Sequence, residues 1–239
     1  MNTQQAYKSF SPSLIPAEQL ANPQLAEQIA TSRFVVCGEV HGATQNCDIL
    51  YSLIIHYGIT SLALELFAET CKAFIDSCIA GQPNFELIDA DYFIASVMSV
   101  EMAKTLAVLV NEKKISDIHY TNGNTEQAKA HNILALKQSG PTICLMGNWH
   151  TEAELVVTDG IEHKSAYMIV RDSEPESINI RYKYLSGAIY NVGTGIMRFN
   201  GLKSANGPQI DNSRYAITAV PGQSRCYTLT VPSANPTAH

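Results

Sequence analysis

The segment RFVVCGEVHG (residues 33–42) decides the fold, because it holds a short β-branched run that ends in a polar turn. The amphipathic stretch TQNCDILYSLIIHYG (44–58) follows and closes on Gly58, a residue typical of helix C-termini. The same order of strand, loop and helix returns in TSLALEL (60–66) and AETCKAFIDSCIAG (68–81). Two such units in series predict strands that pair in parallel.

Two more strands are predicted downstream, each in reach of a helical pattern. The longest helical pattern spans 92–114 and precedes the strand ISDIHY (115–120). A further helix, NTEQAKAHNILALKQSG (124–140), leads into the apolar strand PTICLMGN (141–148). The chain is therefore expected to form an α/β fold with a mainly parallel sheet flanked by helices.

The sequence pattern changes past residue 160, where short β-type runs alternate with turn residues. These runs are SAYMIVR (165–171), SINIRYKY (177–184), RYAITAV (214–220) and RCYTLTV (225–231). We expect a β-rich C-terminal part that adds antiparallel strands to the sheet. The predicted organisation is an N-terminal extension (1–24), an α/β core (25–158), a β-rich part of the same domain (159–231) and a disordered tail (232–239).

The amino-acid composition limits the classes of protein to which the chain can belong. With 239 residues, of which 46% are apolar and 16% charged, the chain can bury its own core without a metal or disulfide. No apolar run approaches the ~18 residues that cross a bilayer, and no signal peptide is evident. A soluble, cytoplasmic protein is expected, with secretion left open if a leader has been removed. The oligomeric state is not set by the sequence.

The net charge and the spacing of the cysteines limit which classes of partner the chain can be expected to bind. The chain carries 16 basic and 22 acidic residues, a net charge of −6, and no basic face for a nucleic acid is apparent. Six cysteines lie at wide spacings without a C-x-x-C pair, so reduced and buried thiols are expected. A small-molecule or peptide substrate is the expected partner.

The chemistry is expected just after the strands, because ligands of open parallel sheets bind beyond the carboxyl ends of the strands. Four strand ends carry titratable side chains, and these are Glu39, His41, Glu65, His119, Tyr120, His150 and Glu152. Gly38 and Gly147 each open a G-x-x-H turn, where a glycine would let the backbone bend sharply off the sheet. Both turns follow buried-type strands, which random placement would rarely produce.

The blocks GEVHG, ALELF and GNWHTE resemble a known superfamily, the erythromycin-esterase-like, ChaN-like haem-uptake and TIKI/TraB proteins. The resemblance covers about residues 33–152, including the helix AKAHNI. It implies a hydrolase or a haem-uptake protein, and related domains are embedded in larger bacterial proteins. The family often has an Arg-Asp pair before that helix, whereas Thr125 and Glu126 stand here, so a ligand-gripping role for that arginine does not carry over.

Two mechanisms are open for the predicted catalytic residues, which are Glu39, His41, Glu65 and His150. In the first, His41, Glu65 and His150 hold a divalent zinc, manganese or cobalt ion that activates water. In the second, one histidine oriented by a glutamate is the general base and the other polarises the acyl group. The resemblance to the TIKI branch favours a metal, and the esterase branch does not require one.

Five further residues are predicted to contact substrate, with core, capping or surface roles as the alternatives: His119, Tyr120, Asn148, Trp149 and Glu152. The leading functional hypothesis is a hydrolase of an ester, lactone or amide. One alternative is a non-catalytic protein that binds haem or another small ligand, through Tyr120 or a histidine. Another is a toxin or effector module, which rests on analogy alone.

Overall fold

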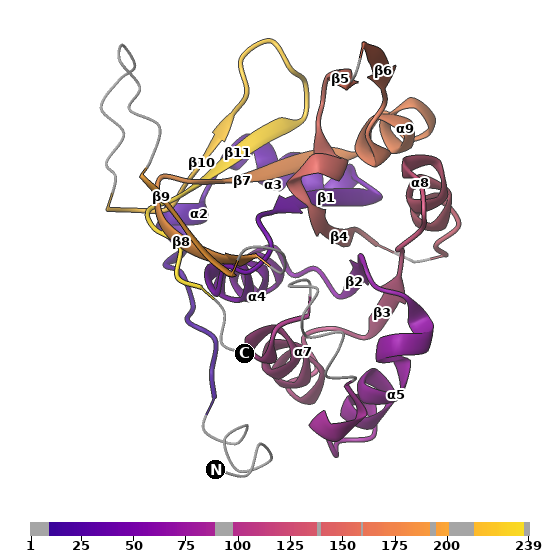
Figure 1. Cartoon of the computed structure of the whole chain (residues 1–239), viewed down its shortest axis with the longest axis vertical. Helices are drawn as coiled ribbons and strands as arrows, with labels where there is room; N and C mark the ends of the chain where they lie inside the picture. Colours follow the sequence, from indigo (N-terminus) through magenta and orange to yellow (C-terminus); the bar gives the residue numbers. More distant parts are fainter. Residues whose placement is uncertain are drawn as a thin grey trace.

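The computed structural model describes residues 10–88, 98–137, 140–158, 160–191, 195–200 and 213–236. Its centre is a seven-stranded sheet with the order β10-β11-β7-β1-β4-β2-β3 (Figure 1). Six of these strands run parallel, and only β10 is antiparallel, against β11. The sheet strands are β1 (Phe34–Glu39), β2 (Ser61–Leu64), β3 (Asp117–Tyr120), β4 (Thr142–Gly147), β7 (Ile178–Tyr184), β10 (Ala216–Ala219) and β11 (Cys226–Val231). The predicted α/β class with an antiparallel addition is confirmed.

Helices cover both faces of the sheet. They are α2 (Ala17–Leu20), α3 (Pro23–Thr31), α4 (Gln45–Tyr57), α5 (Ala68–Ile79), α7 (Val100–Asn111), α8 (Glu126–Leu134) and α9 (Ala166–Ser173), with 3-10 turns η1 (Phe85–Leu87) and η2 (Asn148–Thr151). Along β1, Val35 and Cys37 pack in a large hydrophobic cluster with α2 to α7. Phe34 and Val36 point the other way, into a smaller cluster with α8 and α9. This alternation is what a parallel strand buried on both faces requires.

Local signals set the start of α3 and the ends of α4 and α5 as predicted, whereas α8 ends at Leu134, before the expected terminal Gly140. The side chain of Asn22 caps α3 by accepting a hydrogen bond from the backbone N–H of Leu25 at 3.0 Å. Gly58 and Gly81 follow α4 and α5 with φ of 63° and 74°, in the left-handed region that favours glycine. The predicted helix over 92–114 is described only from Val100 to Asn111, and residues 89–97 lie outside the described part.

The prediction of a strand at 165–171 is wrong, because this segment is the helix α9. The side chain of Ser165 accepts a hydrogen bond from the N–H of Met168 at 3.1 Å and so caps the helix. Ala166, Tyr167 and Val170 recur at helical spacing along α9, and their side chains are buried in the smaller hydrophobic cluster. A cap and a three-to-four-residue period therefore outweigh the β-branched composition.

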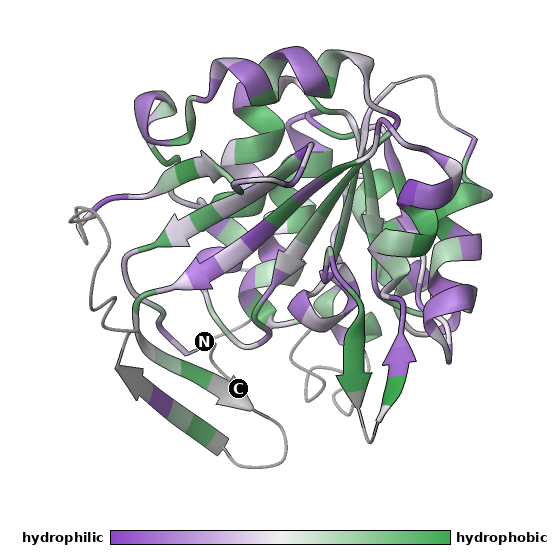
Figure 2. Ribbon diagram, turned by 90° about the horizontal axis from the view of Figure 1, so that it is seen from above, coloured by the Kyte–Doolittle hydropathy of each residue, from purple (hydrophilic) through white to green (hydrophobic). Residues whose placement is uncertain are grey.

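The C-terminal strands enter the sheet more deeply than expected. β7 pairs in parallel with β1 and β11 pairs in parallel with β7, so both are interior strands and only β10 forms an antiparallel edge. Two separate antiparallel hairpins complete the described fold, β5 (Val156–Thr158) with β6 (Ile161–His163) and β8 (Ser186–Asn191) with β9 (Gly195–Asn200). Figure 2 shows β5 and β6 projecting from the body of the molecule.

Residues 232–236, here called the C-terminal strap, are held by backbone hydrogen bonds although the sequence predicts a disordered tail. The N–H of Ala234 donates to the carbonyl of Ser186 at 2.8 Å. On the other side, the N–H of Thr44 donates to the carbonyl of Asn235 at 2.9 Å, and Ala43 pairs with Pro236. The rest of the predicted tail, 237–239, lies outside the described residues.

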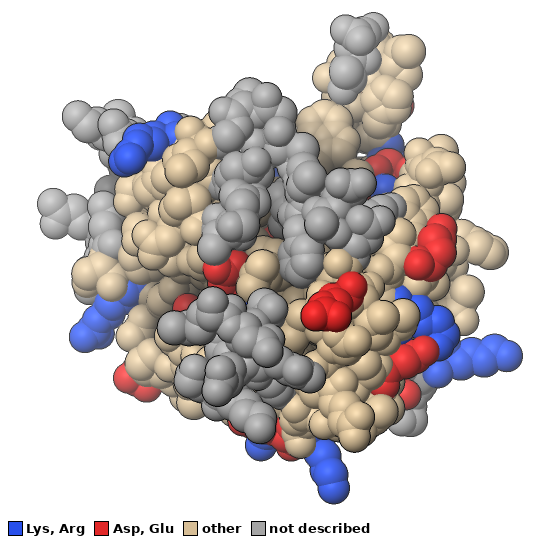
Figure 3. Space-filling view, turned by 60° about the horizontal axis from the view of Figure 1, so that its bottom comes forward, with Lys and Arg blue, Asp and Glu red and all other residues tan. Residues whose placement is uncertain are grey.

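Charge is mixed on the surface that Figure 3 shows, where described acidic and basic side chains are interspersed without a continuous basic area. Within the described ranges, no helix combines the length and the apolar character that a bilayer crossing demands.

Candidate active site

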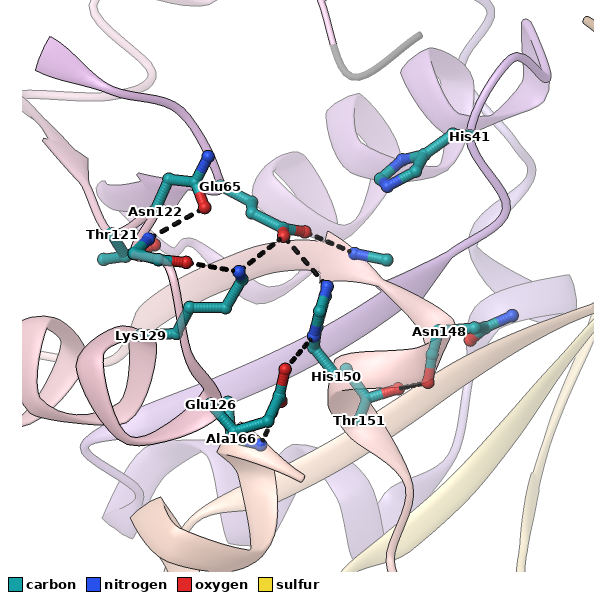
Figure 4. Close-up of polar contacts among 12 residues, drawn as sticks. His41, Glu65, Thr121, Asn122, Glu126, Lys129, Asn148, His150, Thr151 and Ala166 are labelled. Carbon is teal, nitrogen blue, oxygen red and sulfur yellow. Dashed lines mark hydrogen bonds and ion pairs between the residues drawn. The ribbon is translucent and has the colours of Figure 1, made fainter. Parts of the chain in front are cut away.

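Three neighbouring strands, β1, β4 and β2, end beside one another, and each delivers one predicted site residue. His41 follows β1, His150 lies in η2 directly after β4, and Glu65 follows β2. Figure 4 shows their side chains gathered in one place, although more than one hundred positions separate the two histidines in the chain. The parallel pairing of β1, β4 and β2 causes this convergence.

His41 is oriented by Glu39, the last residue of β1. Its ring nitrogen Nδ1 donates to Oε1 of Glu39 at 2.9 Å. Glu39 is only 2% exposed, and its second oxygen, Oε2, has no hydrogen-bond partner among the described residues. The His41 side chain is 31% exposed, and no described residue forms a hydrogen bond with its other nitrogen, Nε2. Nε2 is therefore the free ring nitrogen of the site.

Glu65 is held from three sides. Its Oε2 accepts a hydrogen bond from the backbone N–H of Gly147 at 2.9 Å. Its Oε1 lies 3.0 Å from Nε2 of His150 and 3.4 Å from Nζ of Lys129. Burial raises the pKa of Glu65, but the hydrogen bonds and the charge of His150 outweigh it and hold the pKa below its usual range. Glu65 is thus a fixed anion.

His150 lies between two carboxylates. Its Nε2 faces Glu65, and its Nδ1 donates to Oε1 of Glu126, the first residue of α8, at 2.5 Å. The other oxygen of Glu126 accepts from the N–H of Ala166 at 2.7 Å, which ties α8 to the start of α9. Burial lowers the pKa of His150, but Glu126 and Glu65 raise it to about 9. His150 is therefore an imidazolium at neutral pH.

Lys129 adds a second cation to this network. It follows Glu126 by three residues in α8, so both side chains leave the same side of the helix. Lys129 is buried, and its Nζ donates to the carbonyl of Gly123 at 2.7 Å while it approaches Glu65. The negative charges of Glu65 and Glu126 are thus balanced by the positive charges of Lys129 and His150.

Glu126 and Lys129 were not among the predicted site residues. The spacing E-x-x-K puts them on one helix face, but the sequence does not say which face of α8 meets the sheet. Glu126 stands where the resembling family often has the second residue of an Arg-Asp pair, and that was the one signal available. Besides His150, the network's cation is Lys129, three residues further along α8.

The free histidine and its glutamate influence each other. Burial lowers the pKa of His41, yet the hydrogen bond and charge of Glu39 raise it above its ordinary value. Burial also raises the pKa of Glu39, against the opposing pull of His41. The nearby charge of Glu65 further favours the protonated form of His41.

The two predicted glycines do not bend the backbone sharply, contrary to expectation. Gly38 is a regular residue of β1, and Gly147 has φ of −61°, which any residue can adopt. Their role is to lack a side chain. A Cβ on Gly147 would lie 2.8 Å from Nε2 of His41, and one on Gly38 would lie 2.1 Å from Oγ1 of Thr151. The missing side chain of Gly147 leaves room for the His41 ring, and that of Gly38 lets η2 fold back onto the sheet.

The predicted metal site of His41, Glu65 and His150 requires ring nitrogens with a lone pair directed at a common point. Among the described residues, no group of three or more His, Cys, Asp or Glu side chains is placed to hold an ion. Both ring nitrogens of His150 already face carboxylates, which leaves no lone pair for a metal. This arrangement of donors among the described residues does not fit an ion.

The other predicted residues lie in varied places. Tyr120 packs against the large cluster, and burial together with the charge of Asp76 raises its pKa, so it faces α5. His119, its neighbour in β3, has a buried Nε2 without a described partner. Trp149 is 57% exposed and does not belong to the core. Asn148, the first residue of η2, and Glu152, which follows η2, line a separate cavity over β7.

Comparisons with known proteins identify the fold alone. No protein-family model matches the chain, and a search of curated proteins finds no similar sequence. A Bacillus cereus protein solved by structural genomics matches with a TM-score of 0.59 at 12% identity, over 99% of each chain. A succinoglycan biosynthesis protein matches with a TM-score of 0.55 at 11% identity, over 99% of this chain and 97% of that one. These two similarities show a shared fold.

A toxin effector domain from Vibrio vulnificus aligns with a TM-score of 0.47 at 12% identity, over 84% of this chain and 40% of that one. At that TM-score the match carries no argument about function.

Proposed function

We propose that this protein is a hydrolase that activates water with His41 and cleaves an ester, lactone or amide. One observation carries the proposal. Of the four ring nitrogens of the two site histidines, only Nε2 of His41 is without a described hydrogen bond, while a buried carboxylate fixes the opposite nitrogen. In its neutral form, an imidazole oriented in this way is the usual general base of hydrolytic enzymes, and the raised pKa of His41 shifts the appearance of that form to higher pH.

The reaction then needs no metal. Nε2 of His41 takes a proton from water, the hydroxide oxygen bonds to the acyl carbon, and the resulting intermediate expels the leaving group. The protonated His41 returns its proton to that leaving oxygen or nitrogen. Glu39 keeps the Nδ1 proton in place throughout and stabilises the imidazolium that forms. The resemblance of the GEVHG, ALELF and GNWHTE blocks to esterase-like proteins supports the same reaction class.

In this proposal His150 acts as a fixed charge. With both of its N–H groups donated to Glu65 and Glu126, it cannot exchange a proton with substrate without breaking a hydrogen bond. Its role is to hold Glu65 in place near His41.

Activity of purified protein on p-nitrophenyl acetate and dihydrocoumarin tests the proposal. We expect His41→Ala to lower kcat/KM by roughly 100-fold or more, the size typical of a lost general base. His131→Ala, which removes an exposed histidine from α8, is the matched control and should keep full activity. A chelator should leave the wild type active. Full activity of His41→Ala, with an unchanged thermal midpoint, would refute the proposal.

Haem binding has less support as an alternative. Of the two kinds of iron ligand expected, Tyr120 packs toward α5 against the large hydrophobic cluster, so a site histidine alone would have to bind the iron.

A further inference from the structure

A concave site lies next to η2, the 3-10 turn that carries His150 of the proposed active site. It is a cavity of about 450 Å³ lined mainly by β7, β11 and the residues that flank η2. Cys226 of β11 lines it and also belongs to the cluster beneath α9, which places the cavity on the α9 side of the sheet. Its volume falls in the range of roughly 300–1,000 Å³ that is common for small-molecule sites.

An arginine–glutamate pair forms one wall of the cavity. Nη1 and Nη2 of Arg181 donate to the two carboxylate oxygens of Glu152 at 2.7 and 2.5 Å. The two side chains are 36% and 29% exposed, so the pair is held in place but is still accessible to a ligand in the cavity. A bidentate pair of this kind presents donors and acceptors in a rigid plane.

The loop after η2 and the turn between β10 and β11 are bridged across the cavity. Nε2 of Gln223, in that turn, donates to Oε1 of Glu154 at 2.8 Å. Asn179 of β7 donates to the carbonyl of Thr151 at 2.7 Å and secures η2 from below. The walls are thus connected to one another by hydrogen bonds, as expected of a preformed site.

The charges that line the cavity cancel. Arg181 and Lys183 are cations, whereas Glu152 and Glu154 are anions. An anionic ligand would meet two carboxylates, and a cationic one would meet a guanidinium and an ammonium. A neutral ligand with hydroxyl groups can donate to the carboxylates and accept from the cations at once.

We propose that this cavity binds a neutral, polyhydroxylated ring, that is, an uncharged sugar unit. The proposal does not depend on hydrolysis at His41, because none of the residues that line the cavity belongs to the Glu39–His41 pair or to the Glu65–His150 network.

Three sugars with the same ring and different charge test the proposal by saturation-transfer NMR and calorimetry on the full chain. They are methyl β-glucoside, which is neutral, glucosamine, which is a cation, and glucuronate, which is an anion. We expect the glucoside to bind about tenfold more tightly than either charged sugar, a difference of roughly 1.4 kcal/mol. Absence of glucoside binding, or a wild-type preference for a charged sugar, would overturn the proposal.

Variants reverse the charge balance and so make the test specific. Glu152→Gln leaves the cavity with one excess positive charge and should shift the preference to glucuronate. Lys183→Gln, at an exposed position that folding tolerates, should shift it to glucosamine. Glu176→Gln removes the acid of another arginine–glutamate pair, outside the cavity, and should change nothing. Preferences that neither cavity variant alters would overturn the proposal.

His41→Ala separates this proposal from the hydrolase proposal. It should lose turnover and bind the glucoside like the wild type. Loss of glucoside binding in His41→Ala would show that the sugar occupies the active site instead, and would also overturn the assignment to this cavity.

Discussion

His150 is held as an imidazolium between Glu65 and Glu126, and this charge has a consequence for stability. Its pKa is about 9 in the folded protein, against an ordinary value of 6.5. A raised pKa stabilises the folded state fully below pH 6.5, and the stabilisation is lost as the pH rises from 6.5 to 9. At 1.36 kcal/mol per pKa unit, the loss is on the order of 3 kcal/mol.

Urea unfolding at pH 6 and pH 9.5 checks this prediction. The wild type should lose on the order of 3 kcal/mol more unfolding free energy between these pH values than His150→Gln, which cannot take up the proton. The difference between the two proteins removes the contributions of the titrating groups that do not interact with His150. Parallel pH dependences would mean that His150 is not charged in the folded state.

Glu39 raises the pKa of His41, so Glu39→Gln should lower it. The amide oxygen can still accept the Nδ1 proton, but the negative charge that favours protonated His41 is gone. Because only neutral His41 accepts a proton from water, the ascending limb of kcat/KM against pH should move to lower pH. The plateau should fall by roughly 10-fold or more, since the imidazolium loses its partner. A lower plateau with an unmoved limb would indicate a purely structural role for Glu39.

The strand-to-turn junctions of β1 and β4 depend on two glycines that should respond differently to alanine. Gly147→Ala would put a methyl 2.8 Å from the His41 ring, so activity should fall while stability changes little. Gly38→Ala would put a methyl 2.1 Å from Thr151 and 2.5 Å from Asn148, side chains that fix η2, so stability should fall by roughly 1–3 kcal/mol.

Gly140→Ala is the matched control, because a Cβ there meets nothing within 4 Å. Thermal unfolding and p-nitrophenyl acetate turnover of the three variants check the prediction. Equal effects of Gly147→Ala and Gly38→Ala on both measurements would contradict it.

Elements with a strong local signal could be predicted from the sequence, and contacts between elements could not. The strands that end in Glu39, Glu65 and Gly147 stand out as apolar runs, and general knowledge of parallel sheets then brings their ends together. The helix α9 was missed because its β-branched composition hides a period of three to four residues. Glu126 was missed as a site residue because its contact with His150 depends on how α8 packs.

At the scale of the whole molecule, the C-terminal strap lies beside the turn that carries His41. The C-terminal strap contacts Thr44 and Gln45, which follow His41 by three and four residues. On its other side the strap lies against Gly187, whose φ of 117° and close approach to Ala234 admit no side chain. The strap therefore links the turn that carries His41 to the hairpin that begins at β8.

Truncation after Val231 should release that turn. The variant loses the hydrogen bonds of Asn235 to Thr44 and Gln45, worth roughly 0.5–1.5 kcal/mol each. Amide exchange in residues 43–47 should therefore accelerate by roughly tenfold or more, and kcat should fall because His41 is less well oriented. A chain that ends at Pro236 keeps the strap and should match the wild type. Unchanged exchange after truncation at Val231 would mean that helix α4 and β1 alone fix the His41 turn.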